Sequence, residues 1–184
     1  MVMLFESPRI KLRKMTKEDA SLYNKWQNDM DVMVSTNPSL DVYSMEATMD
    51  FVHHVMLGSS AAKCYIMMDK EKDVPIGIVS LINIDYKNRN AECIIDIGEK
   101  EYWGKGYGAE GMQLILDYAF REMNLHRVSL RVFSFNDRAI RLYSKIGFQK
   151  EGISRQSLFR NGKWHDIIQM GLLQHEYLSI RGAG

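Results

Sequence analysis

The residues of this chain best placed to do chemistry are glycines. Gly104, Gly106 and Gly108 occupy every second position just before an apolar-periodic segment at residues 112–120. A residue without Cβ lets a ligand approach the backbone closely, and the first amides of a helix are unpaired donors at the positive end of its dipole. This combination predicts a cradle for an anion, above all for a phosphate group.

Two other glycine-rich loops fit the sequence less well. Gly106, Gly108 and Gly111 satisfy G-x-G-x-x-G, but a dinucleotide-binding fold also needs a strand abutting the glycines and an acidic residue about 20 positions further on. Here residues 98–101 separate the glycines from the preceding strand, and residues 129–132 hold no acid. A Walker loop fails because no Gly-Lys-Ser/Thr ends the run. The number of glycines in this short stretch also makes a helix entry without a ligand unattractive.

Strands and helices alternate around the glycine run. Strands are expected at residues 9–15, 63–69, 76–85, 91–97 and 127–133, and helices at 16–28, from 44 to about 56, from the glycine run to about 122, and at 136–146. Two final strands flank Asn161-Gly162, a strong hairpin signal. This order predicts a mixed, mostly antiparallel seven-stranded sheet flanked by about four helices. We assign it to the α/β (α+β) class and expect one domain over residues 1–184.

Composition excludes several functional classes. The chain carries 24 Lys+Arg and 23 Asp+Glu, mixed along its length, so no nucleic-acid partner is expected. Its apolar runs are strand-sized, which argues against a membrane span, and the first residues are too soon acidic for a signal peptide. Cys64 and Cys93 lie in strand-like runs, so we expect a reduced, cytoplasmic protein. The five histidines lack metal-ligand spacing, so no metal is expected.

Two motifs resemble those of a known family. Residues 103–110, Trp-Gly-Lys-Gly-Tyr-Gly-Ala-Glu, resemble motif A of the GNAT superfamily of N-acetyltransferases, in the form of its Rim-type branch. Residues 136–148 resemble motif B, and residues 159–166 resemble the terminal hairpin of that branch. Trp103 replaces the Gln/Arg of the superfamily pattern, as often happens in the Rim-type branch. Residues 174–178 are similar to those of spermidine acetyltransferases.

The resemblance implies a GNAT-like fold with acetyl-CoA as the acetyl donor. The cofactor would lie between the strands at 91–97 and 127–133, which splay apart in this family, with a bulge in the first. The pantetheine arm would pair with the backbone of Ile95, Asp96 and Ile97. The remaining cofactor-binding residues implied are Trp103, Gly104, Lys105, Gly106, Tyr107, Gly108, Ala109, Asn136 and Arg141. Simple N-capping of the following helix is the alternative role of Asn136, and the two roles are compatible.

The resemblance also implies a proton donor. Acetyl transfer to an amine requires the departing thiolate of CoA to be protonated. Tyr143 occupies the motif-B position where this family often supplies that general acid, and a hydroxyl there fits proton donation. Packing beside Leu142 and Phe148 is the alternative role of this side chain.

The group that removes a proton from the amine is less fixed. Glu92 sits where the Rim-type branch commonly has glutamate and is the first candidate for the general base. Asp96 lies on the same face of an ideal strand. Pairing of Glu92 with Arg89 or Arg131 stays open, as does a water chain to a distant carboxylate. Asp29 and Asp31 could line a site for a cationic acceptor.

The predicted activity is transfer of the acetyl group from acetyl-CoA to a primary amine. A polyamine, another small-molecule amine and a protein N-terminal amine stay open as acceptors. A CoA-sensing module that acetylates nothing is the alternative from another functional class. The final hairpin offers an exposed edge, so we expect a homodimer.

Overall fold

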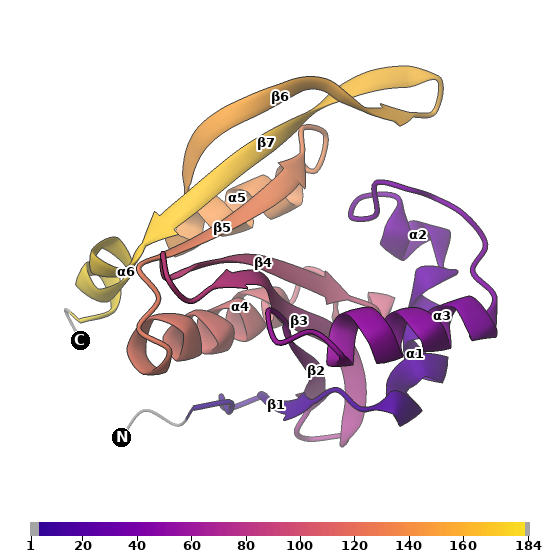
Figure 1. The fold of residues 1–184 in the computed structure, drawn as a ribbon, viewed down its shortest axis with the longest axis horizontal. Helices are drawn as coiled ribbons and strands as arrows, with labels where there is room; N and C mark the ends of the chain where they lie inside the picture. Colours follow the sequence, from indigo (N-terminus) through magenta and orange to yellow (C-terminus); the bar gives the residue numbers. More distant parts are fainter. Residues whose placement is uncertain (1–3, 183–184) are drawn as a thin grey trace.

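A mostly antiparallel sheet of seven strands runs through the computed structural model, which describes residues 4–182 (Figure 1). Across the sheet the strands are β1 (Ile10–Lys14), β2 (Lys63–Asp69), β3 (Val74–Asp85), β4 (Asn90–Ile97), β5 (Arg127–Phe133), β7 (Lys163–Leu173) and β6 (Gln149–Arg160). Among these strands, β4 and β5 form the one parallel pair. The predicted sheet is therefore confirmed.

Helices flank this sheet. They are α1 (Ala20–Gln27), α2 (Met30–Met33), α3 (Met45–Phe51), α4 (Tyr107–Asp117), α5 (Asp137–Ile146) and α6 (Gln174–Arg181), with short 3-10 or π segments η1 (Lys17–Asp19), η2 (Val52–Leu57), η3 (Lys100–Tyr102) and η4 (Tyr118–Glu122). The sequence pattern does not predict α2 or α6. Helix α3 begins where predicted because the Ser44 hydroxyl accepts a hydrogen bond from the Ala47 amide at 3.1 Å.

Alternate side chains of β2 face two different apolar layers. Tyr65 and Met67 join the core that α4 covers, whereas Cys64 and Ile66 join a second cluster with Trp26 of α1. This period of two is what a strand buried on both faces requires. The sheet is therefore held between α4 on one side and α1 with the α3–η2 segment on the other.

The parallel pair of β4 and β5 is short. It runs from Asn90 opposite Arg127 to Glu92 opposite Ser129, and beyond that point the two strands are not paired. The backbone edge of β4 from residue 93 onward therefore faces a gap rather than a neighbouring strand. The predicted splay of these two strands is confirmed.

The bulge expected in β4 is wrong. β4 pairs with β3 without interruption from Glu92 to Ile97, and the register shift lies in β3 between Ile82 and Asp85. Asn83, within that shift, has a φ of 51°. Asparagine is one of the few residues that tolerate this left-handed conformation, so the extra residue is accommodated in β3.

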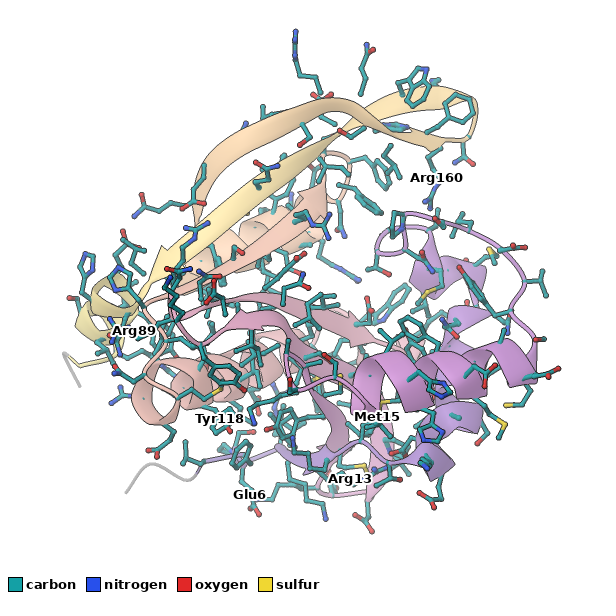
Figure 2. The ribbon with its side chains drawn as sticks, viewed as in Figure 1. Glu6, Arg13, Met15, Arg89, Tyr118 and Arg160 are labelled. Carbon is teal, nitrogen blue, oxygen red and sulfur yellow. The ribbon has the colours of Figure 1, made fainter. Side chains whose placement is uncertain are left out.

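The β6–β7 hairpin extends beyond the other strands toward α2 (Figure 1). Asn161 and Gly162 form its turn with φ angles of 52° and 73°, which confirms the predicted hairpin. Arg160, labelled in Figure 2, reaches from this hairpin and donates hydrogen bonds to the carbonyls of Val34 at 2.6 Å and Asn37 at 2.7 Å. The hairpin thereby holds the segment that follows α2.

Within residues 4–182, no helix has the length and apolar character needed to cross a membrane. Cys64 and Cys93 are buried free thiols. The described part of the chain contains no cluster of three or more His, Cys, Asp or Glu side chains that could hold a metal ion.

Candidate active site

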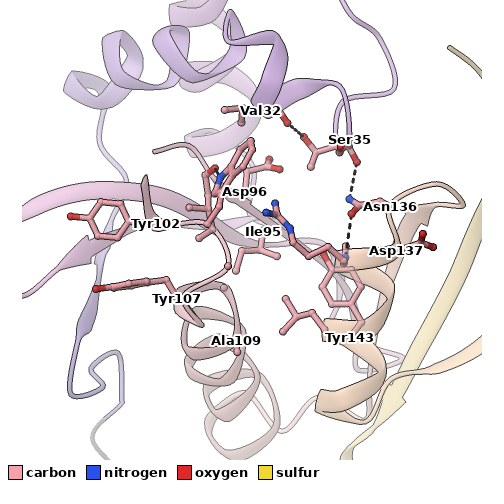
Figure 3. A pocket seen from close by; sticks show the side chains of 18 of the residues that line it. Val32, Ser35, Ile95, Asp96, Tyr102, Tyr107, Ala109, Asn136, Asp137 and Tyr143 are labelled. Carbon is pink, nitrogen blue, oxygen red and sulfur yellow. Dashed lines mark hydrogen bonds between the residues drawn. The ribbon is translucent and has the colours of Figure 1, made fainter. Parts of the chain in front are cut away.

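A cavity of about 560 Å³ opens where β4 and β5 part. Its walls come from β4, the glycine run, the start of α5 and the end of α2 (Figure 3). The predicted site residues that line it are Ile95, Asp96, Ile97, Trp103, Gly104, Gly106, Tyr107, Gly108, Ala109, Asn136 and Tyr143. Most of the residues predicted from two distant motifs therefore share one cavity.

The glycine run presents a set of free backbone amides. Among residues 4–182, the amides at positions 104–109 donate no hydrogen bond to the protein. Gly104 and Gly106 have φ angles of 71° and 86°, which side chains other than hydrogen rarely allow. The chain thus turns sharply into the N-terminus of α4, where amides and the helix dipole favour a bound anion. This donor set fits the pyrophosphate of acetyl-CoA.

Arg9, just before β1, braces this run from outside the cavity. Its guanidinium donates a hydrogen bond to the Lys105 carbonyl at 3.0 Å, lies 4.3 Å from the centre of the Tyr107 ring and forms an ion pair with Glu110. Nothing in the sequence pattern predicts these contacts, because 96 residues separate Arg9 from Lys105. The shape of the cradle therefore depends in part on the first strand.

Close packing fixes α4 beneath the cradle. A Cβ on Gly111 would lie 2.4 Å from the Met67 Cε and 3.4 Å from the Ile95 Cδ1. The third glycine of the apparent G-x-G-x-x-G pattern thus serves contact between α4 and the sheet. Just upstream, the Tyr102 hydroxyl donates to the Asp69 carboxylate at 2.7 Å and anchors the approach to the run.

Trp103 covers the end of β4. Its indole Nε1 donates a hydrogen bond to the Ile97 carbonyl at 2.8 Å, and the Arg138 guanidinium of α5 lies 4.8 Å from its ring centre. The ring therefore bridges the two walls of the cavity near its mouth. An aromatic side chain can do this, and a Gln or Arg could not stack in the same way.

Tyr143 projects from α5 toward the cavity (Figure 3). Its ring lies 6.0 Å from that of Phe148 in an edge-on arrangement, so the predicted packing role is present. Burial, and then the charges of Cys93 and Asp96, raise the pKa of the Tyr143 hydroxyl above its usual value. The hydroxyl therefore stays protonated at neutral pH and can act as a proton donor.

Two carboxylates of β4 also line a smaller adjoining cavity of about 160 Å³, together with Tyr143. Glu92 is engaged: the Arg131 Nε donates to its Oε1 at 2.8 Å, and the Asn83 Nδ2 donates to its Oε2 at 3.3 Å. Asp96 is less engaged, because its buried Oδ1 has no hydrogen-bond partner among residues 4–182. Burial raises the pKa of Asp96 to about 6, and the nearby Thr36 hydroxyl opposes this rise.

Comparison with known proteins decides the family. Residues 9–149 match the acetyltransferase (GNAT) domain. This chain belongs to the GNAT family. It is similar to the uncharacterized N-acetyltransferase p20 of Bacillus licheniformis, with 33% identity over 171 residues, covering 92% of this chain and 95% of that protein.

Solved GNAT structures resemble this chain over nearly its whole length. A crystal structure of spermidine N-acetyltransferase from Vibrio cholerae, in complex with CoA and spermine, matches with a TM-score of 0.85 and 29% identity, covering 94% of this chain and 99% of that one. A dodecameric structure of spermidine N-acetyltransferase from Vibrio cholerae matches with a TM-score of 0.79 and 28% identity, covering 95% and 99%. The chain is thus an acetyl-CoA-dependent N-acetyltransferase.

Some predicted residues of this GNAT protein lie outside the large cavity. Lys105 and Arg141 are exposed and do not line it, whereas Arg138, one helical turn before Arg141, does. Asp29 also lies outside it, whereas Asp31 lines it; both face Lys100, whose Nζ lies 3.1 Å and 2.7 Å from their carboxylate oxygens. The two acids therefore have a counter-ion of their own.

Asn136 joins the cofactor motif to the opposite wall. Its Oδ1 accepts from the Ala139 amide at 3.2 Å, which confirms the predicted N-cap of α5. Its Nδ2 donates to the Ser35 carbonyl at 3.2 Å (Figure 3). This second contact is long-range, and no local sequence signal predicts it.

Proposed function

We propose that this N-acetyltransferase acetylates a small-molecule primary amine, with acetyl-CoA held by the free amides at positions 104–109 and with Tyr143 as the proton donor. One observation carries the proposal. The Tyr143 hydroxyl, which stays protonated, and the two β4 carboxylates line the same cavity system as the amide cradle. Reactants held there would be close enough for direct transfer without a covalent enzyme intermediate.

The chemistry requires two proton movements. A free alkylamine has a pKa near 10.4, so it arrives as an ammonium and must lose a proton before it attacks the thioester. Glu92 and Asp96 are the two candidates on this wall for the group that takes that proton. Tyr143 then donates a proton to the departing sulfur. The exposed edge of β4 at Ile95 to Ile97 is the surface against which the pantetheine arm would align.

The Rim-type form of the glycine motif and the tail at residues 174–178 resemble those of enzymes that acetylate peptide amines or polyamines, so these acceptors must be tested beside other small amines. The similar Vibrio cholerae enzyme acts on spermidine, so polyamines belong in any acceptor panel. The assembly is a further part of the proposal. β6 is an edge strand, and Phe159 and Trp164 near its turn are 56% and 60% exposed, so we expect a homodimer that forms through this hairpin. We also expect the enzyme to be cytoplasmic.

The function is tested by incubating the full chain with acetyl-CoA, a thiol-detecting reagent and a panel of primary amines. The panel contains spermidine, arylalkyl monoamines, amino sugars and a short peptide with a free N-terminus. The expected result is release of CoA with at least one small amine, and one added acetyl group on that amine by mass spectrometry. Binding of acetyl-CoA by calorimetry without acetylation of any amine would instead support a CoA-sensing module.

A further inference from the structure

Asp96 stands where three cavities meet. It lines the large cofactor cavity, the smaller one beside Glu92, and a third of about 430 Å³ between α1, α3 and β4. Thr36 is the other residue that all three share. A group bound at Asp96 would thus be reached from the α1–α3 side and would face the thioester from the other.

The carboxylate of Asp96 lacks the partner that such a group needs. Its buried Oδ1 accepts no hydrogen bond within residues 4–182, and no Lys, Arg or His there forms an ion pair with it. A buried polar atom left in this state destabilises the folded chain, so it points to a partner that arrives with a ligand. Glu92 contrasts with it, because Arg131 and Asn83 already occupy both of its oxygens.

The lining of the third cavity indicates which kind of ligand it can bind. Asp96 is the one charged residue in its lining, and the remainder is largely aromatic or aliphatic. The rings of Tyr23 and Phe51 are stacked there with their centres 6.2 Å apart. An aromatic wall with a single carboxylate fits one ammonium carried on an apolar body.

Thr48 and Gln27, two polar residues of this wall, already have hydrogen-bond partners within the protein. The Thr48 hydroxyl donates to the Gln27 Oε1 at 3.0 Å, and the Asn24 Nδ2 donates to the Thr48 Oγ1 at 2.8 Å. Arg160, which is 6% exposed, adds a buried positive charge behind residues 34–38. A second ammonium would find no carboxylate in this cavity and a cation nearby.

We propose that Asp96, rather than Glu92, receives and deprotonates the acceptor ammonium, and that the cavity between α1, α3 and β4 selects a singly charged arylalkyl amine over a polyamine. The inference rests on the proposed function and names its acceptor class. Asp96 takes one proton from the ammonium, and the nitrogen then forms the C–N bond and releases a second proton. Tyr143 gives its proton to sulfur as the C–S bond breaks and regains one of those two, while the other leaves to water.

A pH profile reports on this carboxylate. Tyr23 from α1 and Tyr143 from α5 lie close enough to Asp96 for its charge to act on them, and burial raises the pKa of both, so both stay neutral below pH 8. Tyr43 shares the α1–α3 cavity with Asp96, the paired Glu92 and Arg131 share the smaller one, and Asp31 and Arg138 share the large one. We expect kcat/KM to fall on the acidic side with an apparent pKa of about 6. In Asp96→Asn this acidic limb should be absent from whatever activity remains.

The experiment compares phenethylamine with spermidine as acceptors for the wild type, Asp96→Asn, Glu92→Gln and Asp50→Asn, the last altering an exposed carboxylate of α3. We expect wild-type kcat/KM for phenethylamine to exceed that for spermidine by about tenfold or more. Asp96→Asn should lose activity by roughly 10²-fold or more, as expected for a general base. Its Kd for acetyl-CoA by calorimetry should stay within about twofold of the wild-type value.

Other outcomes would overturn the inference. Loss of activity in Glu92→Gln with little change in Asp96→Asn would overturn the inference and leave the proposed function standing. A preference for spermidine would do the same. Binding of acetyl-CoA without CoA release for any amine in the panel would overturn the proposed function, and this inference with it. Thermal unfolding of all four proteins separates a lost base from a lost fold.

Discussion

The two halves of the cleft are built in different ways. On the cofactor side, the donors are backbone amides from one short stretch, residues 104–109, at the start of α4, which Gly111 allows to pack closely on the sheet. On the acceptor side, the wall comes from α1, α3, β4 and the segment after α2, and Arg160 of β6 holds that segment. Backbone donors tolerate changes of side chain, as Trp103 illustrates. The acceptor wall contacts its ligand through side chains instead, so we expect specificity for the amine to depend on a few of them.

The largest effect is expected at Tyr143, where the two halves meet. Tyr143→Phe removes the hydroxyl and keeps the ring that packs on Phe148. We expect kcat to fall by about 10²–10³-fold, because proton transfer to the leaving sulfur loses its donor. Thiol release measures kcat, and calorimetry should show an unchanged Kd for acetyl-CoA. Tyr118→Phe, a tyrosine of η4 (Figure 2), is the matched control. Unchanged turnover would remove Tyr143 from the mechanism.

The raised pKa of Asp96 should affect the free energy of unfolding as well as turnover. Its folded pKa of about 6 is raised by burial above the ordinary value of 3.8, so the stability it contributes is complete below pH 3.8 and is lost as pH rises through 6. The ionised Asp96 should therefore contribute about 2–3 kcal/mol less to stability at pH 7.5 than the protonated group does in acid, because a tenfold change in an acid constant corresponds to about 1.4 kcal/mol. Asp96→Asn removes that penalty.

Denaturant unfolding at pH 4 and pH 7.5 measures this difference. The advantage of Asp96→Asn over the wild type should be larger at pH 7.5 by that amount. Asp50→Asn, on the exposed face of α3, should show no such dependence. If the free-energy difference between Asp96→Asn and the wild type is the same at both pH values, Asp96 titrates as an ordinary solvated carboxylate. The acceptor side would then lose its distinctive charge.

On the cofactor side, Gly106 is the sharpest test. Alanine there must adopt a φ of 86°, and its Cβ would lie 3.1 Å from the Arg9 Nη2. A left-handed non-glycine residue costs about 1–2 kcal/mol, so the cradle should distort and the Kd for acetyl-CoA rise about tenfold. Gly162→Ala has a similar φ of 73° with open space around it in the hairpin turn, which makes it the matched control. Calorimetry measures the Kd for acetyl-CoA of both variants, and only that of Gly106→Ala should rise. A rise in the KM of the amine alone would contradict the division into two halves.

Local patterns predict much of the cofactor half and little of the acceptor half, for a physical reason. The cap of α5 by Asn136, the Asn161-Gly162 turn and the glycine run are set by neighbours in the sequence. The neutral surroundings of Asp96 arise from residues more than 40 positions away, such as Tyr43 and Thr36. A sequence shows that a carboxylate exists but not which cation reaches it. Pairing of Glu92 with Arg89 or with Arg131 was open from the sequence, and the fold places Arg131 there.

The helices that the pattern does not predict are missed for a different reason. Helix α2 spans only Met30–Met33, too short for a periodic apolar face, and its N-cap is Asp29, whose Oδ1 accepts from the Asp31 amide at 3.0 Å. Helix α6 starts after Leu173, a residue without a capping oxygen, and is closed by Glu176 reaching back to the Leu173 amide at 2.9 Å. In both cases one local side chain, rather than a periodic apolar face, marks the start of the helix.

The smallest effect expected is at Arg160, and it bears most directly on whether the two halves are independent. Its guanidinium is buried, donates to the carbonyls of Val34 and Asn37, and comes from a hairpin more than 120 residues away. Arg160→Met keeps much of the side-chain volume and removes those donors, so the segment after α2 should loosen. Hydrogen bonds to charged groups contribute about 1.5–3 kcal/mol, but a surface segment can find water instead, so we expect a rise of only about fivefold in the KM of the amine.

For Arg160→Met, kcat at saturating amine and the Kd for acetyl-CoA should stay within about twofold, because the hydrogen bonds and ring contact of Arg160 all lie away from the cradle at residues 104–109. Arg155→Met, an exposed arginine of the same strand, controls for loss of positive charge from the hairpin. Steady-state kinetics with the amine varied at saturating acetyl-CoA, and then the reverse, separates the two constants. Equal rises in both would mean that the hairpin supports the whole cleft through Asn136, whose side chain already links the start of α5 to the Ser35 carbonyl in that same segment.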